Sequence, residues 1–336
     1  MSPDRVVARW EPDDDRPDSA VERHWKEQPR EMISQVREML DRAALPGYAH
    51  LYEQAQRHLS VPVRNNSERI DVWLLWADVQ QHHHRFDSAL SALDRVFESD
   101  PVHVQGRLMA ARIHLVKGAY KEARNHCIRL VGNADLLTAS VCAHEAASYQ
   151  GAILDNYQGL LALLERESLP GDARGPWIRQ TMADMATRLG RPQEAIDWLD
   201  GGMSDAASVS YLLQWADAQL VLSHPEKVME RIEPVVTSAP AIDDSLALRL
   251  ALAEQSLVGE EWQAYVKARM ALRVQRRDVE HASDVARYYL QLDPDPEKAL
   301  HWAKLNWQSA REHSDRKLLL KARKMAAKTS KSGEEQ

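Results

Sequence analysis

Apolar and small residues return along this chain at a fixed interval. Phe86 is followed 34 positions later by Tyr120, and Ala89 is followed 34 positions later by Ala123. The aromatic pair and the alanine pair therefore share one period, which indicates a tandem array of repeated units rather than one irregular domain. Ala, Leu, Arg, Glu and Gln are abundant and glycine is scarce, so each unit is expected to be helical.

Small and bulky residues alternate inside each unit in a way that suits paired helices. Ala77 and Ala111 stand where two helices would cross closely, whereas Phe86 and Tyr120 are large enough to fill the gaps between successive pairs. A single helical hairpin leaves an apolar face uncovered, so the units must stack on one another. The seven predicted units span 70–103, 104–137, 141–174, 176–208, 209–242, 246–279 and 280–313.

The first unit, 70–103, carries a large residue, an apolar-small pair, an aromatic residue, an alanine, a bulky residue and a closing proline. These are Trp73, Trp76-Ala77, Phe86, Ala89, Leu93 and Pro101. This pattern resembles the tetratricopeptide repeat. The resemblance implies an all-α, right-handed superhelical solenoid of about seven helical hairpins, with a concave groove and no enzymatic activity.

The segments outside the repeats are expected to cap the array. Residues 30–69 have a helical pattern and should form N-terminal capping helices, and 314–328 should form a basic C-terminal capping helix. Residues 1–29 contain the acidic, proline-broken stretch EPDDDRPD and are expected to be disordered, as is the tail 329–336.

Charge and hydropathy narrow the range of partners. The formal net charge is −7, from 43 basic and 50 acidic side chains, so the chain as a whole offers no attractive field for nucleic acid. No apolar run is long enough for a membrane span. Met1 leads directly into SPDRVVARWEPDDD, without the apolar core of a signal peptide, which predicts a cytoplasmic protein. A periplasmic location is the alternative, if a leader has been removed or mis-assigned.

The chain also resembles a narrower group of bacterial tetratricopeptide proteins that are usually exported and have no assigned biochemical function. The similarity lies in YAHLYEQAQRHL at 48–59, the segment 85–124, LALRLALAEQ at 246–255 and the segment 298–322. It implies a stand-alone repeat protein outside the cytoplasm.

The groove implied by the repeat resemblance would be lined by the first helix of each unit. At one position of these helices every residue is polar or aromatic, and one turn earlier the position holds apolar residues in some units and polar residues in others. Such a stripe suits peptide binding, with apolar pockets for anchors and charges for register, although a solvated face that binds nothing has the same pattern. Acids predominate from Asp184 onward, which predicts a basic partner. The candidate residues are Leu74, Asp78, Leu108, Arg112, Glu145, Tyr149, Gln180, Asp184, Leu213, Asp217, Leu250, Glu254, Asp284 and Tyr288.

The two cysteines are a second candidate feature. Cys127 falls late in one helix and Cys142 early in the next, with a turn near 132–135 between them. They could face each other across the hairpin and form a disulfide in an oxidising compartment. The alternative is that they are two buried thiols that act as small hydrophobes.

Two other polar clusters have simpler explanations. His82, His83 and His84 are adjacent, so they point in different directions on a helix and are better explained as a solvated turn than as a metal site. Lys317, Lys321, Lys324 and Lys328 share one helical face, which could contact acidic lipid or phosphate but is more simply the solvated side of a cap.

No sequence motif indicates catalysis, a cofactor or a bound metal. Phosphate-binding loops, nucleophile elbows and zinc-protease motifs are all missing from the sequence. The leading hypothesis is therefore a non-catalytic scaffold that binds a peptide or protein in its groove. A cell-envelope assembly or maintenance factor is the alternative, and an enzyme or nucleic-acid binder is the third hypothesis.

Overall fold

The computed structural model describes residues 19–334, and the side chains of 21–328. Over these residues the chain forms eighteen α-helices and no strand, which confirms the predicted all-α class. The predicted disorder of 1–18 and 335–336 lies outside the described residues. None of the helices in the described part is long and apolar enough to cross a membrane.

Three helices cover the start of the array: α1 (Ser19–Glu27), α2 (Pro29–Ala43) and α3 (His50–Arg64). The two capping helices were predicted, but α1 lies in the part of 1–29 that was expected to be disordered. It is held by Trp25, whose side chain is buried and whose Nε1 donates to the carbonyl of His58 in α3 at 2.8 Å. The acidic stretch that motivated the prediction of disorder ends just before this helix.

The helices that follow, α4 to α17, can be grouped in chain order into seven hairpins, which is compatible with the predicted repeat. Their first helices begin 32 to 38 residues apart, close to the period seen in the sequence. The pairs are α4 (Ile70–His82) with α5 (Phe86–Ser99), α6 (Val104–Val116) with α7 (Tyr120–Ile128), α8 (Leu136–Ser148) with α9 (Ile153–Leu164), α10 (Arg174–Arg188) with α11 (Pro192–Asp200), α12 (Val209–Val221) with α13 (Pro225–Ser238), α14 (Asp244–Glu254) with α15 (Glu261–Arg276), and α16 (Ala282–Gln291) with α17 (Pro296–Ser309).

The small residues of the repeat lie where helices approach each other. Ala77, Ala89 and Ala123 are fully buried and Ala111 is nearly so, each within an apolar cluster shared by neighbouring helices. A larger side chain at these points would push the helices apart. The stacking core predicted from the alternation of small and bulky residues is therefore present.

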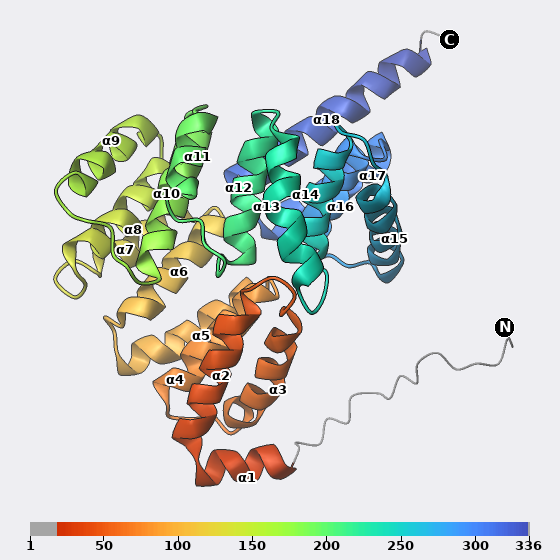
Figure 1. Ribbon diagram of the computed structural model, residues 1–336. Coiled ribbons are helices and arrows are strands. Elements are labelled where there is room, and N and C mark those ends of the chain that lie inside the picture. Colours follow the sequence, from red (N-terminus) through yellow and green to blue (C-terminus); the bar gives the residue numbers. More distant parts are fainter. Residues whose placement is uncertain (1–18, 335–336) are drawn as a thin grey trace, which may run out of the picture.

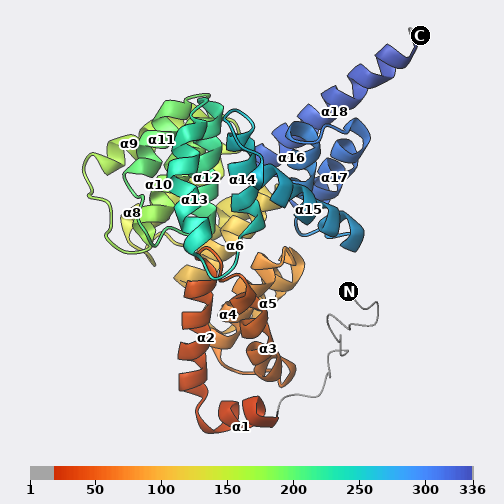
Figure 2. The ribbon, with the colours of Figure 1, turned by 45° about the vertical axis from the view of Figure 1, so that its right-hand side comes forward.

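The array curves until distant parts of the chain touch (Figures 1 and 2). The amide of Val209, at the start of α12, donates to the carbonyl of Ala44 in the α2–α3 loop at 2.9 Å. On another side, His83 Nδ1 lies 3.7 Å from a carboxylate oxygen of Glu280. These contacts join the first helices to the C-terminal half.

The last helix, α18 (His313–Glu334), packs on α16 and α17 and then continues beyond the body of the molecule (Figure 1). The sequence placed the end of this helix at 328 and expected 329–336 to be disordered. The helical backbone instead continues to Glu334, because no proline or glycine interrupts the chain before Gly333.

Candidate partner-binding groove

The groove predicted from the repeat pattern contains a segment of the protein's own chain. We call Ser309–His313, the link between α17 and α18, the crossing segment. The amide of Arg311 donates to the carbonyl of Val116, the last residue of α6, at 2.7 Å. Ala310 is buried in the apolar cluster of α4, α5 and α6. The three-residue link 310–312 between the two helices thus lies against the first two hairpins, with Ala310 in an extended conformation.

Arg112 of α6 anchors this segment by charge. Its Nη2 donates to Glu312 Oε1 at 2.7 Å, and its Nη1 lies 3.6 Å from Oε1 of Glu145 in α8. Burial raises the pKa of Glu145 to about 7, and Arg112 opposes this shift without cancelling it. The Arg112 side chain remains 44% exposed, so it keeps capacity for a further anionic contact.

The next wall of the groove is made by α8 and α10. Arg188 donates from Nε to Asp184 at 2.7 Å and from Nη2 to Ser148 Oγ at 2.6 Å, while its guanidinium lies 3.9 Å from the centroid of the Tyr149 ring. Tyr149 also donates to Asp184 at 3.3 Å and stacks on Tyr120. Burial, and then the charge of Asp184, raise the pKa of Tyr149, so its hydroxyl stays protonated.

Open space remains on both sides of the crossing segment. A cavity of about 470 Å³ lies between it and the α6–α7 and α8–α10 walls, lined by Tyr120, Tyr149, Arg188, Trp307, His313 and Arg316 among others. Nε2 of His313 is buried and has no hydrogen-bond partner. A second cavity of about 480 Å³ lies on the α4–α5 side and is lined by His84, Phe86 and Lys117.

The C-terminal half of the predicted stripe is occupied by buried ion pairs instead. Arg249 of α14 donates to Asp217 of α12 at 3.0 and 3.1 Å and to Asp284 of α16 at 2.8 Å. Asp217 also accepts from Arg287 at 3.2 and 3.3 Å. Burial disfavours the charge of Asp217, but Arg249 and Arg287 outweigh it and hold its pKa below the ordinary value.

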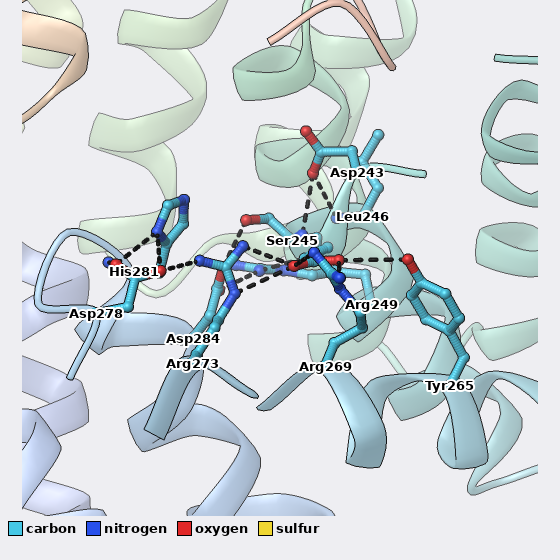
Figure 3. A network of polar contacts seen from close by, with 11 residues as sticks. Asp243, Ser245, Leu246, Arg249, Tyr265, Arg269, Arg273, Asp278, His281 and Asp284 are labelled. Atoms are coloured by element: carbon cyan, nitrogen blue, oxygen red, sulfur yellow. Dashed lines mark hydrogen bonds and ion pairs between the residues drawn. The ribbon is translucent and has the colours of Figure 1, made fainter. Parts of the chain in front are cut away.

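A second network lies beside this one (Figure 3). Asp244, the first residue of α14, is 6% exposed and accepts hydrogen bonds from Arg269 and Arg273 at 2.7 to 3.2 Å. Arg273 in turn donates to Asp278 at 2.6 Å, and Asp278 contacts His281. The network joins α14 to α15 within one hairpin and connects both to the turn that leads into α16.

These contacts correct the predicted acidic stripe. Glu254 does not face a groove: it accepts the amides of Glu261, Trp262 and Gln263 at 2.9 to 3.3 Å and so caps the first turn of α15. Asp217 and Asp184 are already paired with arginines. A basic partner therefore finds no row of free carboxylates here.

The predicted groove residues fall into three classes of exposure. Arg112 alone is exposed. Half-buried are Leu74, Asp78, Leu108, Tyr149, Gln180, Asp184, Leu213 and Asp217. Buried are Glu145, Leu250, Glu254, Asp284 and Tyr288. Leu250 is a core residue, with none of its surface exposed, and Tyr288 belongs to the same apolar cluster.

The groove residues that the sequence did not indicate are mainly arginines and Glu312. Arg188 could have been found, because it lies four residues after Asp184 on the same helical face. Glu312 had no such signal, since it stands 200 residues from Arg112. Asp78 was also predicted to line the groove, but its carboxylate forms no hydrogen bond or ion pair with the described residues. Its pKa is raised to about 6 by burial and then by the charge of Asp41.

The two cysteines lie in contact between α7 and α8. Cys127 and Cys142 are both buried, and their Cα atoms are 5.4 Å apart, which lies within the range that a disulfide spans. The geometry permits a disulfide between the second and third hairpins.

The histidine triplet lies at the end of α4, as predicted, but not all of it faces solvent. His82 stacks on Tyr52, while Nε2 of His83 is buried without a hydrogen-bond partner. Within residues 19–334 no group of three or more metal-binding side chains comes together.

No protein-family model and no curated protein matches the chain. Among solved structures, it is similar to a tetratricopeptide repeat protein from Parabacteroides merdae, with 13% identity, 87% of this chain and 97% of that chain covered, and a TM-score of 0.40. It is also similar to the TPR domain of P58(IPK), with 14% identity, 88% and 99% covered, and a TM-score of 0.30. Both structures belong to the repeat class that the sequence pattern resembles. At this distance they carry no argument about function, and the description as an array of hairpins rests on the helices themselves.

Proposed function

We propose that this protein is a non-catalytic scaffold that binds an extended segment of a partner protein in the groove of its first three hairpins. The observation that supports it is the crossing segment, which occupies this groove as a peptide would. It supplies a backbone amide to the end of α6, a small side chain to an apolar cluster and a carboxylate to Arg112. A groove that accommodates these three groups in cis has the chemistry to bind them from a partner.

The same contacts define the kind of partner. The groove offers a partly exposed Arg112, and the adjoining cavity is lined by Arg188, Arg311 and Arg316. The carboxylates nearby, Asp184 and Glu145, are already close to arginines. We therefore propose a partner segment with an acidic residue two positions after a small one, the spacing of Ala310 and Glu312.

A peptide with the sequence of residues 307–316 tests this proposal directly. Ala310→Asp places a carboxylate in an apolar cluster and should release the crossing segment, leaving the groove free. We expect this variant to bind the labelled peptide with a Kd on the order of 10–100 μM by fluorescence polarisation, as befits a short segment. The wild type, whose groove is filled in cis, should bind at least about tenfold more weakly.

Two further variants make the test specific. Adding Arg112→Glu to the Ala310→Asp variant should abolish peptide binding, because it removes the anchor for Glu312. Adding Arg124→Glu, which changes an exposed arginine on α7 by the same charge, should leave binding unchanged. Equal binding by both double variants, or no binding by a folded Ala310→Asp variant, would refute a peptide-binding groove.

The cysteine pair supports a second candidate, a scaffold that works in the cell envelope. Disulfides persist in oxidising compartments and are rare in the cytosol. If this candidate is correct, protein denatured rapidly in acid from its native cells should have no thiol that reacts with maleimide until a reductant is added. Two reactive thiols in that experiment would place the protein in a reducing compartment.

A further inference from the structure

The outer face of α18 is lined by basic side chains. Between Arg316 and Lys328 the exposed residues are six cations and two small or apolar residues, and no acid occurs anywhere in this stretch. At 100° per residue they occupy one continuous arc of about 160° on the helix. They are Arg316, Lys317, Leu320, Lys321, Arg323, Lys324, Ala327 and Lys328.

Packing fixes the orientation of this face. Leu319 and Ala322, on the opposite side, are buried in the core shared with α16 and α17, and Leu318 and Met325 pack against it. The helix cannot rotate to hide its cations without exposing these apolar side chains. The basic arc is thus held toward solvent by the fold.

Five of the six cations of the arc make no ion pair with an acid in the described part of the chain: Arg316, Lys317, Lys321, Arg323 and Lys324. The charge of Lys321 helps to lower the pKa of Asp217, whereas Arg112 and Arg188 pair directly with acids. The six cations of the arc belong to a chain with a net charge of −7, so the remainder carries −7 − 6 = −13. A polyanion would therefore be attracted to α18 and repelled by the rest of the molecule.

We infer that the basic face of α18 docks onto an anionic lipid surface and holds the hairpin array beside a membrane. The attraction would be electrostatic, since the apolar face of α18 packs in the core and Leu320, 51% exposed, is the one large apolar side chain that is exposed between Arg316 and Lys328. The C-terminal part of α18 projects from the body in both views, so a flat surface can reach it (Figures 1 and 2). The preference for lipid over nucleic acid rests on the envelope location proposed from the cysteine pair.

Co-sedimentation with vesicles tests the inference. The full chain should bind vesicles of phosphatidylcholine containing about one third phosphatidylglycerol, and not vesicles of phosphatidylcholine alone. The bound fraction should fall steeply as NaCl is raised from about 0.05 to about 0.5 M. The charge-reversal variant K317E/R323E/K324E should lower the partition coefficient at least about tenfold.

A matched variant separates this surface from net charge. K121E/K227E/K267E reverses three exposed lysines on α7, α13 and α15, which gives the same change in net charge, and should bind vesicles like the wild type. The neutral variant K317Q/R323Q/K324Q should show an intermediate loss. Circular dichroism of each triple variant should match that of the wild type, which excludes misfolding as the cause of a loss of vesicle binding.

Three results would overturn the inference. The first is equal binding to charged and uncharged vesicles, and the second is an equal loss in the two charge-reversal variants. The third is tighter binding to a random-sequence DNA duplex than to the anionic vesicles, with loss in K317E/R323E/K324E, which would assign the face to nucleic acid. None of these results bears on peptide binding in the groove, so the two proposals fail independently.

Discussion

Replacing Arg249 with methionine is expected to lower the free energy of unfolding by about 3–5 kcal/mol. Arg249 is 6% exposed and is the shared partner of Asp217 and Asp284, two acids on helices either side of α14. Its removal leaves Asp284 buried with only the hydroxyl of Ser245 as a close donor, at 2.5 Å. Urea denaturation followed by circular dichroism measures the loss.

A second substitution tests whether the loss comes from the stranded charge. R249M/D284N removes the acid that R249M leaves unpaired, so the double variant should be more stable than R249M alone. Arg124→Met, on the exposed face of α7, is the control and should change stability by less than about 0.5 kcal/mol. A loss in R249M no greater than in this control would mean that the pair does not hold α12, α14 and α16 together.

The ion pairs of Asp217 and Asp284 also make the free energy of unfolding of the wild type depend on pH. Burial opposes the charge of Asp284, yet Arg249 and the Ser245 hydroxyl hold its pKa below the ordinary value, as Arg249 and Arg287 do for Asp217. Groups with lowered pKa add stability above the pKa of the unfolded chain, and this is lost as the pH falls below about 4. R249M should therefore lose less stability than the wild type over that range.

Reducing the Cys127–Cys142 bond is expected to lower the free energy of unfolding by about 3 kcal/mol, the value for a loop of about 15 residues. A disulfide at this position would link α7 to α8 with a sequence separation of 15, and so would restrict the unfolded chain where the second hairpin meets the third. Denaturation of the oxidised wild type with and without dithiothreitol measures the difference. Both sulfurs are buried, so reduction should be slow until the chain opens.

The variant C127A/C142A controls for effects of the reductant. It should be about as stable as the reduced wild type and should not respond to dithiothreitol, because alanine fills part of each buried position without adding a polar group. If dithiothreitol leaves the wild type unchanged, the two residues act as buried thiols, and the argument for an oxidising compartment fails with them.

The hairpins could be predicted because their causes are local. Ala77, Ala89, Ala111 and Ala123 recur at the spacing that close helix crossings require, and they are buried as that spacing predicts. The proximity of Cys127 and Cys142 was also suggested by the sequence, since both flank one short turn. α1 was missed because a single residue, Trp25, secures it by a contact with a helix some thirty positions away.

The candidate site could be predicted only in part. Arg112, Tyr149 and Asp184 were predicted as polar residues at one repeat position; Tyr149 lines the cavity beside the crossing segment, and Arg112 and Asp184 pair with Glu312 and Arg188, which also line it. The same rule selected Leu250 and Glu254, which are buried in the core and at a helix cap. Burial at equivalent repeat positions differs from one hairpin to the next, as at Arg112, which is exposed, and Glu254, which is buried.

The class of the fold, the period of the hairpins and the basic character of the last helix could be predicted, because each follows from residues close together in the chain. The position of residues 309–313 in the groove and the pairing of its acids could not, because they depend on contacts between distant parts of the chain. Arg112 and Glu312 are 200 residues apart, and Asp217 and Arg287 are 70 apart. Such pairs form because small rotations between hairpins add up to a curve that brings distant helices together, and no local pattern specifies that sum.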